Sequence, residues 1–300
     1  MRFSFWLPNS LTWDETLAAG RSAAALGYET LWYADHFMPN ASEPADGPIH
    51  EAFVVLGALA AAVPDVRLGT MVVGNTYRNP AVLAKMAATL DHVSGGRFTL
   101  GLGAGWQENE HAAYGIDFRT FGWRFDRLEE TCRALASFWS ERRTTLDGVH
   151  LQLKDAPLDP KPVQSPLPLL IGGGGEKRTL RIVADYAQQW NVWGTPEFLA
   201  AKIGVLTDHC RTISRDPSTI HKTAVALLFL CESAEQAAKL RATPMPRPAV
   251  IGTAPEAAEQ MRAYAAAGVD EFIVPGFTFR SADERDDVLG RLMHDVAPNC

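Results

Sequence analysis

The feature of this sequence that most constrains its fold is a regular alternation of short apolar runs with amphipathic segments. Eight apolar runs are each followed by a segment whose apolar residues recur at helical spacing. The predicted strands are 2–7, 30–34, 66–73, 97–102, 167–171, 190–193, 223–231 and 271–274. Strands that alternate with helices form parallel sheets, so eight such units in 300 residues predict an α/β fold, a single (β/α)8 TIM barrel. A doubly wound open sheet is the competing topology, although it usually has fewer strands at this length.

The segments that follow the strands are predicted to be helices, and no linker interrupts them. The predicted helices are 14–26, 51–63, 80–90, 124–139, 176–186, 196–214, 234–240, 255–267 and 282–294. Asp147-Gly148 stands between two alternating runs over 144–153 and predicts an inserted β-hairpin. Because no Ser/Gly tract, charge block or repeat marks a boundary, we expect residues 1–300 to form one domain with extended strand-end loops.

Composition and charge exclude several classes of protein. A hydrophobic content of 47% with 21% charged residues excludes a disordered chain, and a net charge of −7 argues against a nucleic-acid partner. The longest nearly apolar run, 52–63, is too short to span a bilayer, and the first residues contain no signal-peptide core. The four cysteines lie far apart without a C-x-x-C pair, which is typical of reduced cytosolic thiols. We therefore expect a soluble cytoplasmic protein without a membrane partner.

Asp35-His36 is the best acid–base candidate in the sequence. Functional side chains of a (β/α)8 barrel gather at the carboxyl ends of the strands, and this pair directly follows the second predicted strand. Histidine exchanges protons most easily near neutral pH, and the adjacent carboxylate is placed to orient its ring. The alternative is a histidine that only caps the following loop.

Four consecutive glycines, Gly172 to Gly175, lie between a predicted strand and a predicted helix. Bare backbone lets a ligand approach closely, and several N–H groups together with a helix N-terminus suit a phosphate. Lys177 and Arg178 place positive charge in the first turn of the predicted helix, where the helix dipole is also positive. A nearby anion would offset this repulsion. A phosphate site is therefore predicted, with a tight turn whose glycines serve packing as the alternative.

Other motifs are weaker. Gly101-Leu-Gly-Ala-Gly105 resembles half a dinucleotide fingerprint but follows the fourth strand, so we expect it to admit a flat ligand to the barrel mouth. Trp6, Trp106 and Trp193 lie within or just after strands, where an indole at the mouth stacks on a planar ring.

The histidines lack metal-ligand spacing, so no metal site is expected. The absence of G-x-S-x-G and of a cysteine in a strand-end loop leaves covalent catalysis with little support.

Four motifs, taken together and in order, resemble the bacterial luciferase-like monooxygenase superfamily. They are WYADHF at 32–37, LGTMVVGNTYRNP at 68–80, GLGAGW at 101–106 with Glu110 and Tyr114-Gly115 behind it, and IGGGGEKRTL at 171–180. Within the superfamily the chain is most similar to the branch that uses the deazaflavin coenzyme F420. This resemblance implies a (β/α)8 barrel and a homodimer.

The resemblance also implies a reaction and a site. Hydride passes between F420 and a small organic substrate, Asp35 contacts the deazaflavin ring, and His36 donates or accepts a proton. The residues implied to border the cofactor are Val73, Gly74, Asn75, Gly103, Ala104 and Asn109, with Gly173, Gly174 and Gly175 at its phosphate. A non-proline cis peptide is implied at Val72-Val73 or Val73-Gly74.

The sequence departs from the sugar-phosphate dehydrogenases of this branch at one position. Those enzymes have Glu directly after the G-x-G of the fourth strand, where this chain has Trp106. The departure weakens the case for glucose-6-phosphate oxidation and favours a more apolar substrate, with Trp106, Trp6 and Trp193 as pocket residues. Glu108 or Glu110 is an alternative acid–base partner, unless each is a solvated residue at a helix start.

Two other functions remain open at this point. One is an FMN-dependent, two-component monooxygenase on the same barrel, and the other is a cofactor-binding or storage protein without catalytic activity. The intact Asp35-His36 pair favours an enzyme over the second of these.

Overall fold

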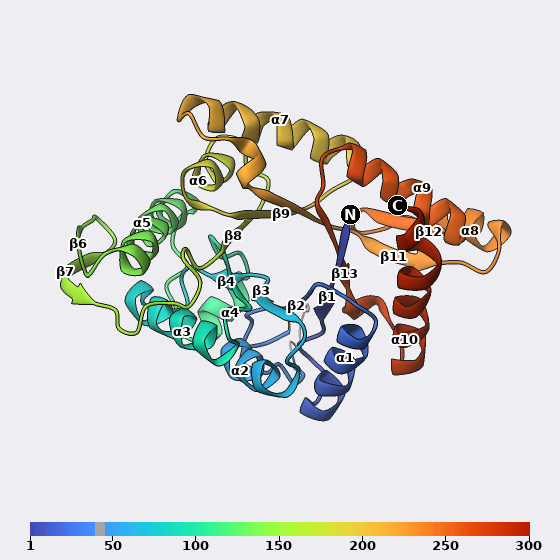
Figure 1. Cartoon of the computed structure of the whole chain (residues 1–300), viewed down its shortest axis with the longest axis horizontal. Coiled ribbons are helices and arrows are strands. Elements are labelled where there is room, and N and C mark those ends of the chain that lie inside the picture. The colour runs from blue at the N-terminus through green and yellow to red at the C-terminus, as the bar shows by residue number, and fades with distance from the viewer. Residues whose placement is uncertain (40–45) are drawn as a thin grey trace.

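The computed structural model describes residues 1–39 and 46–300. A closed ring of parallel strands forms its centre, and helices surround the ring (Figure 1). The strands of the ring are β1 (Arg2–Leu7), β2 (Thr30–Tyr33), β3 (Arg67–Thr70), β4 (Val73–Gly74), β5 (Phe98–Gly103), β8 (Leu169–Gly172), β9 (Gln189–Trp193), β10 (His221–Val225) and β13 (Glu271–Pro275). They pair in the order β3-β2-β1-β13-β10-β9-β8-β5-β4, and an additional pairing of β3 with β5 closes the ring. With β3 and β4 sharing one of the eight positions, the (β/α)8 barrel is confirmed and the open-sheet alternative is wrong.

Most of the helices begin at capping signals of the sequence, α4 and α6 being exceptions. They are α1 (Trp13–Ala25), α2 (Ala52–Ala62), α3 (Pro80–Val93), α4 (Glu108–Ala113), α5 (Phe121–Ser140), α6 (Thr179–Tyr186), α7 (Pro196–Thr212), α8 (Ala234–Arg241), α9 (Ala254–Ala266) and α10 (Ala282–Arg291). Thr12 and Glu15 form a capping box at α1, while Asn79 and Thr195 cap α3 and α7, which both start with proline. The helix α4, which carries part of the site, was not predicted. Among the described residues no helix is long and apolar enough to cross a membrane.

The core has two layers because alternate residues of each strand face opposite sides of the ring. Trp32, Leu170 and Ile273 belong to the buried cluster inside the barrel. Leu31, one residue before Trp32, belongs instead to the larger cluster between the strands and the helices. Full burial of one such side chain stabilises the fold by about 1.5–3 kcal/mol. This packed interior holds the strand ends, and therefore the site, in place.

Two predicted strands are interrupted in the structure. The run 66–73 divides into β3 and β4 around a cis Met71–Val72 peptide bond, so the implied position of the cis bond was wrong by one or two residues. The run 223–231 divides at Ala226, after which β11 (Leu227–Leu230) leaves the ring and pairs in parallel with β12 (Ala249–Gly252). Both parts of the second run are mostly buried, so its apolar pattern carried no sign of the break. The strand β12 was not predicted.

The predicted hairpin is present outside the ring. It consists of β6 (Arg143–Asp147) and β7 (Gln152–Pro157), which pair antiparallel. The carboxylate of Glu130 on α5 accepts hydrogen bonds from the N–H groups of Val149, His150 and Leu151, each at 2.9 Å. The tip of the hairpin is thereby attached to α5.

Candidate active site at the barrel mouth

The predicted site residues lie at the carboxyl ends of several barrel strands. His36 follows β2, and Gly103 ends β5. Gly173 to Gly175, here called the glycine loop, follow β8, and Trp193 ends β9. The register agrees with this placement, since Gly74 of β4 lies opposite Gly103 of β5. Because all strands of the ring are parallel, these ends share one mouth, where ligands bind in barrels of this kind.

His36 is held by a buried carboxylate from another part of the chain. Glu110 on α4 is fully buried, and its Oε1 lies 3.2 Å from Nδ1 of His36. Its Oε2 accepts hydrogen bonds from the N–H groups of Phe37 at 2.5 Å and Met38 at 3.3 Å, and the hydroxyl of Tyr77 donates to Oε1. Burial by itself raises the pKa of Glu110, but the hydrogen bonds from His36, Tyr77 and Phe37 outweigh it and hold the pKa below its ordinary value. The interpretation of Glu110 as a solvated residue was therefore wrong.

Glu108, the other alternative partner for the acid–base chemistry, is exposed at the first position of α4. No hydrogen bond joins it to His36 within residues 1–39 and 46–300. Of the two glutamates that the sequence left open, the structure brings only Glu110 to the histidine.

Asp35 is fully buried and pairs with Arg78. The guanidinium donates to both oxygens of Asp35, at 2.5 and 3.0 Å, and to Glu51 at 2.5 Å. Burial raises the pKa of Asp35 above its usual value, while Arg78 acts in the opposite direction. The guanidinium also lies 4.9 Å from the ring centroid of Phe53. The carboxylate of Asp35 is thus occupied by an ion pair that the sequence analysis did not foresee.

The predicted cofactor neighbours on β4 are buried. Val73 and Gly74 are covered, and the side chain of Asn75 is used by α5, donating to the carbonyl of Arg124 at 3.3 Å and accepting from Thr131 at 2.7 Å. By contrast, Ala104 is half-buried and Asn109 is exposed, each close to the end of β5.

The segment between β3 and β4 explains one of the glycines of β5. A Cβ added at Gly103 would lie 2.9 Å from Cγ2 of Val72, closer than real Cβ contacts. Gly103 is therefore required for the approach of Val72, in addition to any role toward a ligand.

The glycine loop leaves several backbone donors uncommitted. Gly173 has φ +117, a conformation that favours glycine, and its N–H donates to the carbonyl of Asn191. In the part of the chain that the structure describes, the N–H groups of Gly174, Gly175 and Glu176 donate to no protein atom. Such a run of free donors ahead of a helix is typical of an anion site.

The cations around this loop differ from the prediction. The helix α6 begins at Thr179, so Arg178 is its N-cap residue and not part of its first turn. Arg178 forms an ion pair with Asp126 of α5, so its charge is balanced without a ligand. Lys177 is exposed. Lys202 of α7, which the sequence analysis missed, lies beside the loop, with its Cε 3.9 Å from the position of a Cβ on Gly174 and its Nζ 2.7 Å from Glu176. Lys202 lies 27 residues after Gly175, and no local pattern connects the two positions.

Aromatic side chains from β1, β9 and the segment after β13 gather at the mouth. The ring centroids of Trp6 and Trp193 lie 6.2 Å apart, and Phe277 lies 5.6 Å from Trp6 and 6.3 Å from Trp193. Trp106 stands apart from them, edge-on to His36 at 5.6 Å and 57% exposed. Phe277 was missed, although it directly follows the Pro-Gly pair at the end of the last strand.

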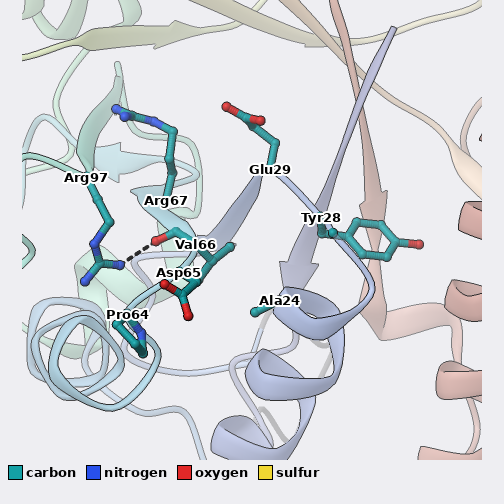
Figure 2. Close-up of a pocket in the computed structure, with 9 residues that line it drawn as sticks. Ala24, Tyr28, Glu29, Pro64, Asp65, Val66, Arg67 and Arg97 are labelled. Carbon is teal, nitrogen blue, oxygen red and sulfur yellow. Dashed lines mark hydrogen bonds between the residues drawn. The ribbon is translucent and has the colours of Figure 1, made fainter.

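A cavity of about 430 Å³ lies at the opposite end of the barrel. Residues that precede β2, β3 and β5 line it, among them Glu29, Asp65 and Arg97 (Figure 2). Arg97 donates to the carbonyl oxygen of Ala60 in the last turn of α2, at 2.7 Å, and to that of Val66, directly before β3, at 2.5 Å. None of the predicted site residues lines this cavity.

Comparisons with known proteins show the family and the fold. The model of a family described as luciferase-like monooxygenase matches residues 1–246. An F420-dependent glucose-6-phosphate dehydrogenase of Kineococcus radiotolerans is 40% identical over 150 residues, which cover 50% of this chain and 43% of that protein. The match thus spans about half the length of this curated relative.

Two solved structures share the fold over nearly their whole length. The F420-dependent tetrahydromethanopterin reductase of Methanopyrus kandleri has a TM-score of 0.84 at 16% identity, covering 99% of this chain and 98% of that one. A monooxygenase from Streptomyces bottropensis has a TM-score of 0.82 at 17% identity, covering 99% of each chain.

Proposed function

This chain belongs to the luciferase-like monooxygenase family, and from that premise we propose that it is an oxidoreductase that uses coenzyme F420. The name of the Kineococcus relative supports the choice of cofactor. The observation that carries the proposal is the glycine loop, whose uncommitted N–H groups stand beside Lys202 at the same mouth as His36. A phosphate-bearing ring cofactor needs such an anion site close to an acid–base group.

The residues of the mouth divide into those that hold the cofactor and one that moves a proton. When bound, the deazaflavin supplies or accepts a hydride. The N–H groups of the glycine loop hold its phosphate, and Lys202, which its ion pair with Glu176 keeps beside the loop, is the cation nearest to it. His36 exchanges a proton with the substrate through Nε2, because Nδ1 is occupied by Glu110. The residues proposed to border the cofactor are Asp35, Val73, Gly74, Asn75, Gly103, Ala104, Asn109, Gly173, Gly174 and Gly175, the buried ones acting through the backbone of their loops.

The proposed substrate is a small organic molecule less polar than a sugar phosphate. Trp6, Trp193 and Phe277 supply an apolar wall, and Trp106 covers the side next to His36. We further propose that the chain works as a single-domain homodimer in the cytoplasm, which sedimentation and cell fractionation test directly.

Titration of the protein with F420 and with FMN, followed by quenching of tryptophan fluorescence, tests the cofactor. Binding of F420 in the micromolar range without FMN binding is the expected result. Binding of FMN alone would overturn the proposal in favour of the FMN-dependent monooxygenase of the same family.

A substitution in the glycine loop tests the phosphate site. Gly174→Asp adds a negative charge to the loop beside Lys202, where it repels the phosphate and competes for the cation, so we expect F420 affinity to fall below detection. Gly204→Asp is the matched control, because Gly204 lies on α7 with open space around its Cβ position. Circular dichroism checks that both variants fold. Lys202→Met is the second variant, because it removes a positive charge without adding bulk, and we expect it to weaken the affinity for F420. Full affinity in both Gly174→Asp and Lys202→Met would contradict the phosphate site.

A further inference from the structure

The carboxylate of Glu110 receives hydrogen bonds from four donors. His36 Nδ1 and the hydroxyl of Tyr77 share Oε1, while the backbone N–H groups of Phe37 and Met38 share Oε2. An ionised carboxylate offers about four acceptor positions and no donor. Every acceptor position of this fully buried group is therefore used, and every partner must supply a hydrogen atom.

This arrangement decides which nitrogen of His36 carries the proton. A neutral imidazole has one N–H donor and one acceptor nitrogen. With an acceptor-only oxygen 3.2 Å from Nδ1, the hydrogen must lie on Nδ1, because the other tautomer would set two lone pairs against each other. The lone pair of the neutral ring is then on Nε2.

The loop that carries His36 is also held by the helix of Glu110. The amide of Gln107, directly before α4, donates to the carbonyl oxygens of Met38 at 3.2 Å and Pro39 at 3.4 Å. The hydroxyl of Tyr114, directly after α4, donates to the carbonyl of Phe37 at 3.0 Å. With Glu110 taking the N–H groups, α4 and its flanks fix both the donors and the acceptors of the backbone after β2.

Asp35, the sequence neighbour of His36, does not share this task. Its two oxygens accept from Arg78, and among the described residues it makes no hydrogen bond to His36. The other ionisable groups near the histidine are Tyr77, which donates to the same glutamate, and Glu51, which pairs with Arg78.

From these contacts we propose that Glu110 is the positioning residue of His36: it keeps the proton of the neutral imidazole on Nδ1, aligns the loop through Phe37 and Met38, and leaves Nε2 to exchange the proton with the substrate. The role of Nε2 in turnover rests on the proposed function, whereas the tautomer does not. Glu110 itself touches neither substrate nor cofactor in this account.

Nitrogen-15 NMR of the chain labelled at histidine tests the tautomer without cofactor or substrate. At a pH where the imidazole is neutral, the signals of His36, assigned by their loss in His36→Ala, should show a protonated Nδ1 and an unprotonated Nε2. A protonated Nε2 in the wild-type chain would overturn the proposal, and this result needs no glutamate variant to fold.

Glu110→Gln tests the cause, and Glu108→Gln is its control. The amide of glutamine donates as well as accepts, so the Nδ1-protonated form should no longer dominate in Glu110→Gln, whereas the exposed Glu108→Gln should match the wild type. An unchanged tautomer in folded Glu110→Gln would overturn the proposal.

Kinetics separate positioning from structural damage. We expect kcat of Glu110→Gln to fall about 10- to 100-fold while F420 affinity stays within about twofold, with partial rescue by Glu110→Asp. Equal losses of kcat and F420 affinity would contradict a positioning role. If the wild type neither binds nor turns over F420, the proposed function fails, and the NMR result still decides the role of Glu110.

Discussion

Two adjacent side chains, Asp35 and His36, have charged partners from different parts of the barrel. Arg78, from the connection after β4, neutralises Asp35, while Glu110, from α4, faces the imidazole of His36. The buried carboxylates at this mouth therefore have separate functions. Asp35 forms an ion pair with Arg78, and Glu110 contacts the imidazole of His36.

Substitution of His36 tests whether this histidine carries the proton. We expect His36→Ala to lower turnover about 100-fold with F420 affinity nearly unchanged, since general acid–base catalysis contributes about 10²–10⁴-fold. Steady-state kinetics and the fluorescence titration measure the two effects. His50→Ala, an exposed histidine, is the control, and full turnover in His36→Ala would remove His36 from catalysis.

Removal of Arg78 tests the buried ion pair. Arg78→Met leaves the buried carboxylate of Asp35 without its partner, so we expect the free energy of unfolding to fall by about 3–5 kcal/mol at neutral pH. Urea denaturation measures the loss. Arg2→Met is the control, because the exposed pair of Arg2 with Glu29 contributes at most about 1 kcal/mol.

The stability deficit of Arg78→Met should depend on pH. Burial raises the pKa of Asp35, so the folded chain retains this proton to a higher pH than the unfolded chain does. The stability linked to that proton is present at low pH and is lost as the pH rises through the folded-state pKa. Without Arg78 the pKa of Asp35 rises further, so the deficit of Arg78→Met should shrink as the pH falls. A deficit that is constant or grows toward acid would contradict this account.

At the scale of elements, the junction of β3, β4 and β5 limits which residues the mouth can contain. Gly103→Ala places a Cβ 2.9 Å from Val72, so we expect a loss of about 1–3 kcal/mol from overpacking. Gly57→Ala on α2, where nothing lies within 4 Å, should be neutral or stabilising by up to about 1 kcal/mol. Thermal unfolding of both variants measures the difference, and equal melting temperatures would show that Val72 gives way.

At the scale of the whole molecule, a cofactor that binds only the folded barrel must stabilise it. At free F420 about 100 times Kd, the free energy of unfolding should rise by about 2.7 kcal/mol. Differential scanning fluorimetry over a range of F420 concentrations follows the rise, with Gly174→Asp as the variant that should show none. A wild-type melting temperature independent of F420 would count against the proposed cofactor.

The barrel was predictable from the sequence because its signal is local. The eight predicted strands and the helices that follow them each leave a periodic pattern, and residues such as Thr12 and Asn79 cap the helix starts in the structure. The exit of β11 was not predictable, because a run buried on both sides of a break looks like one strand. The contact between His36 and Glu110 joins residues 74 positions apart, and no local pattern reports such a distance. For Lys202 the missing information is likewise three-dimensional, since α7 meets the glycine loop by packing beside α6, the helix that follows this loop.

The residues at the barrel mouth come from both halves of the chain. His36, Tyr77 and Glu110 come before the β6–β7 hairpin, whereas the glycine loop, Lys202 and Phe277 come after it. Neither half contains both His36 and the glycine loop. A ligand that contacts both His36 and the glycine loop therefore bridges the two halves of the chain. A gene fragment that encoded either half alone would lack one of these two groups.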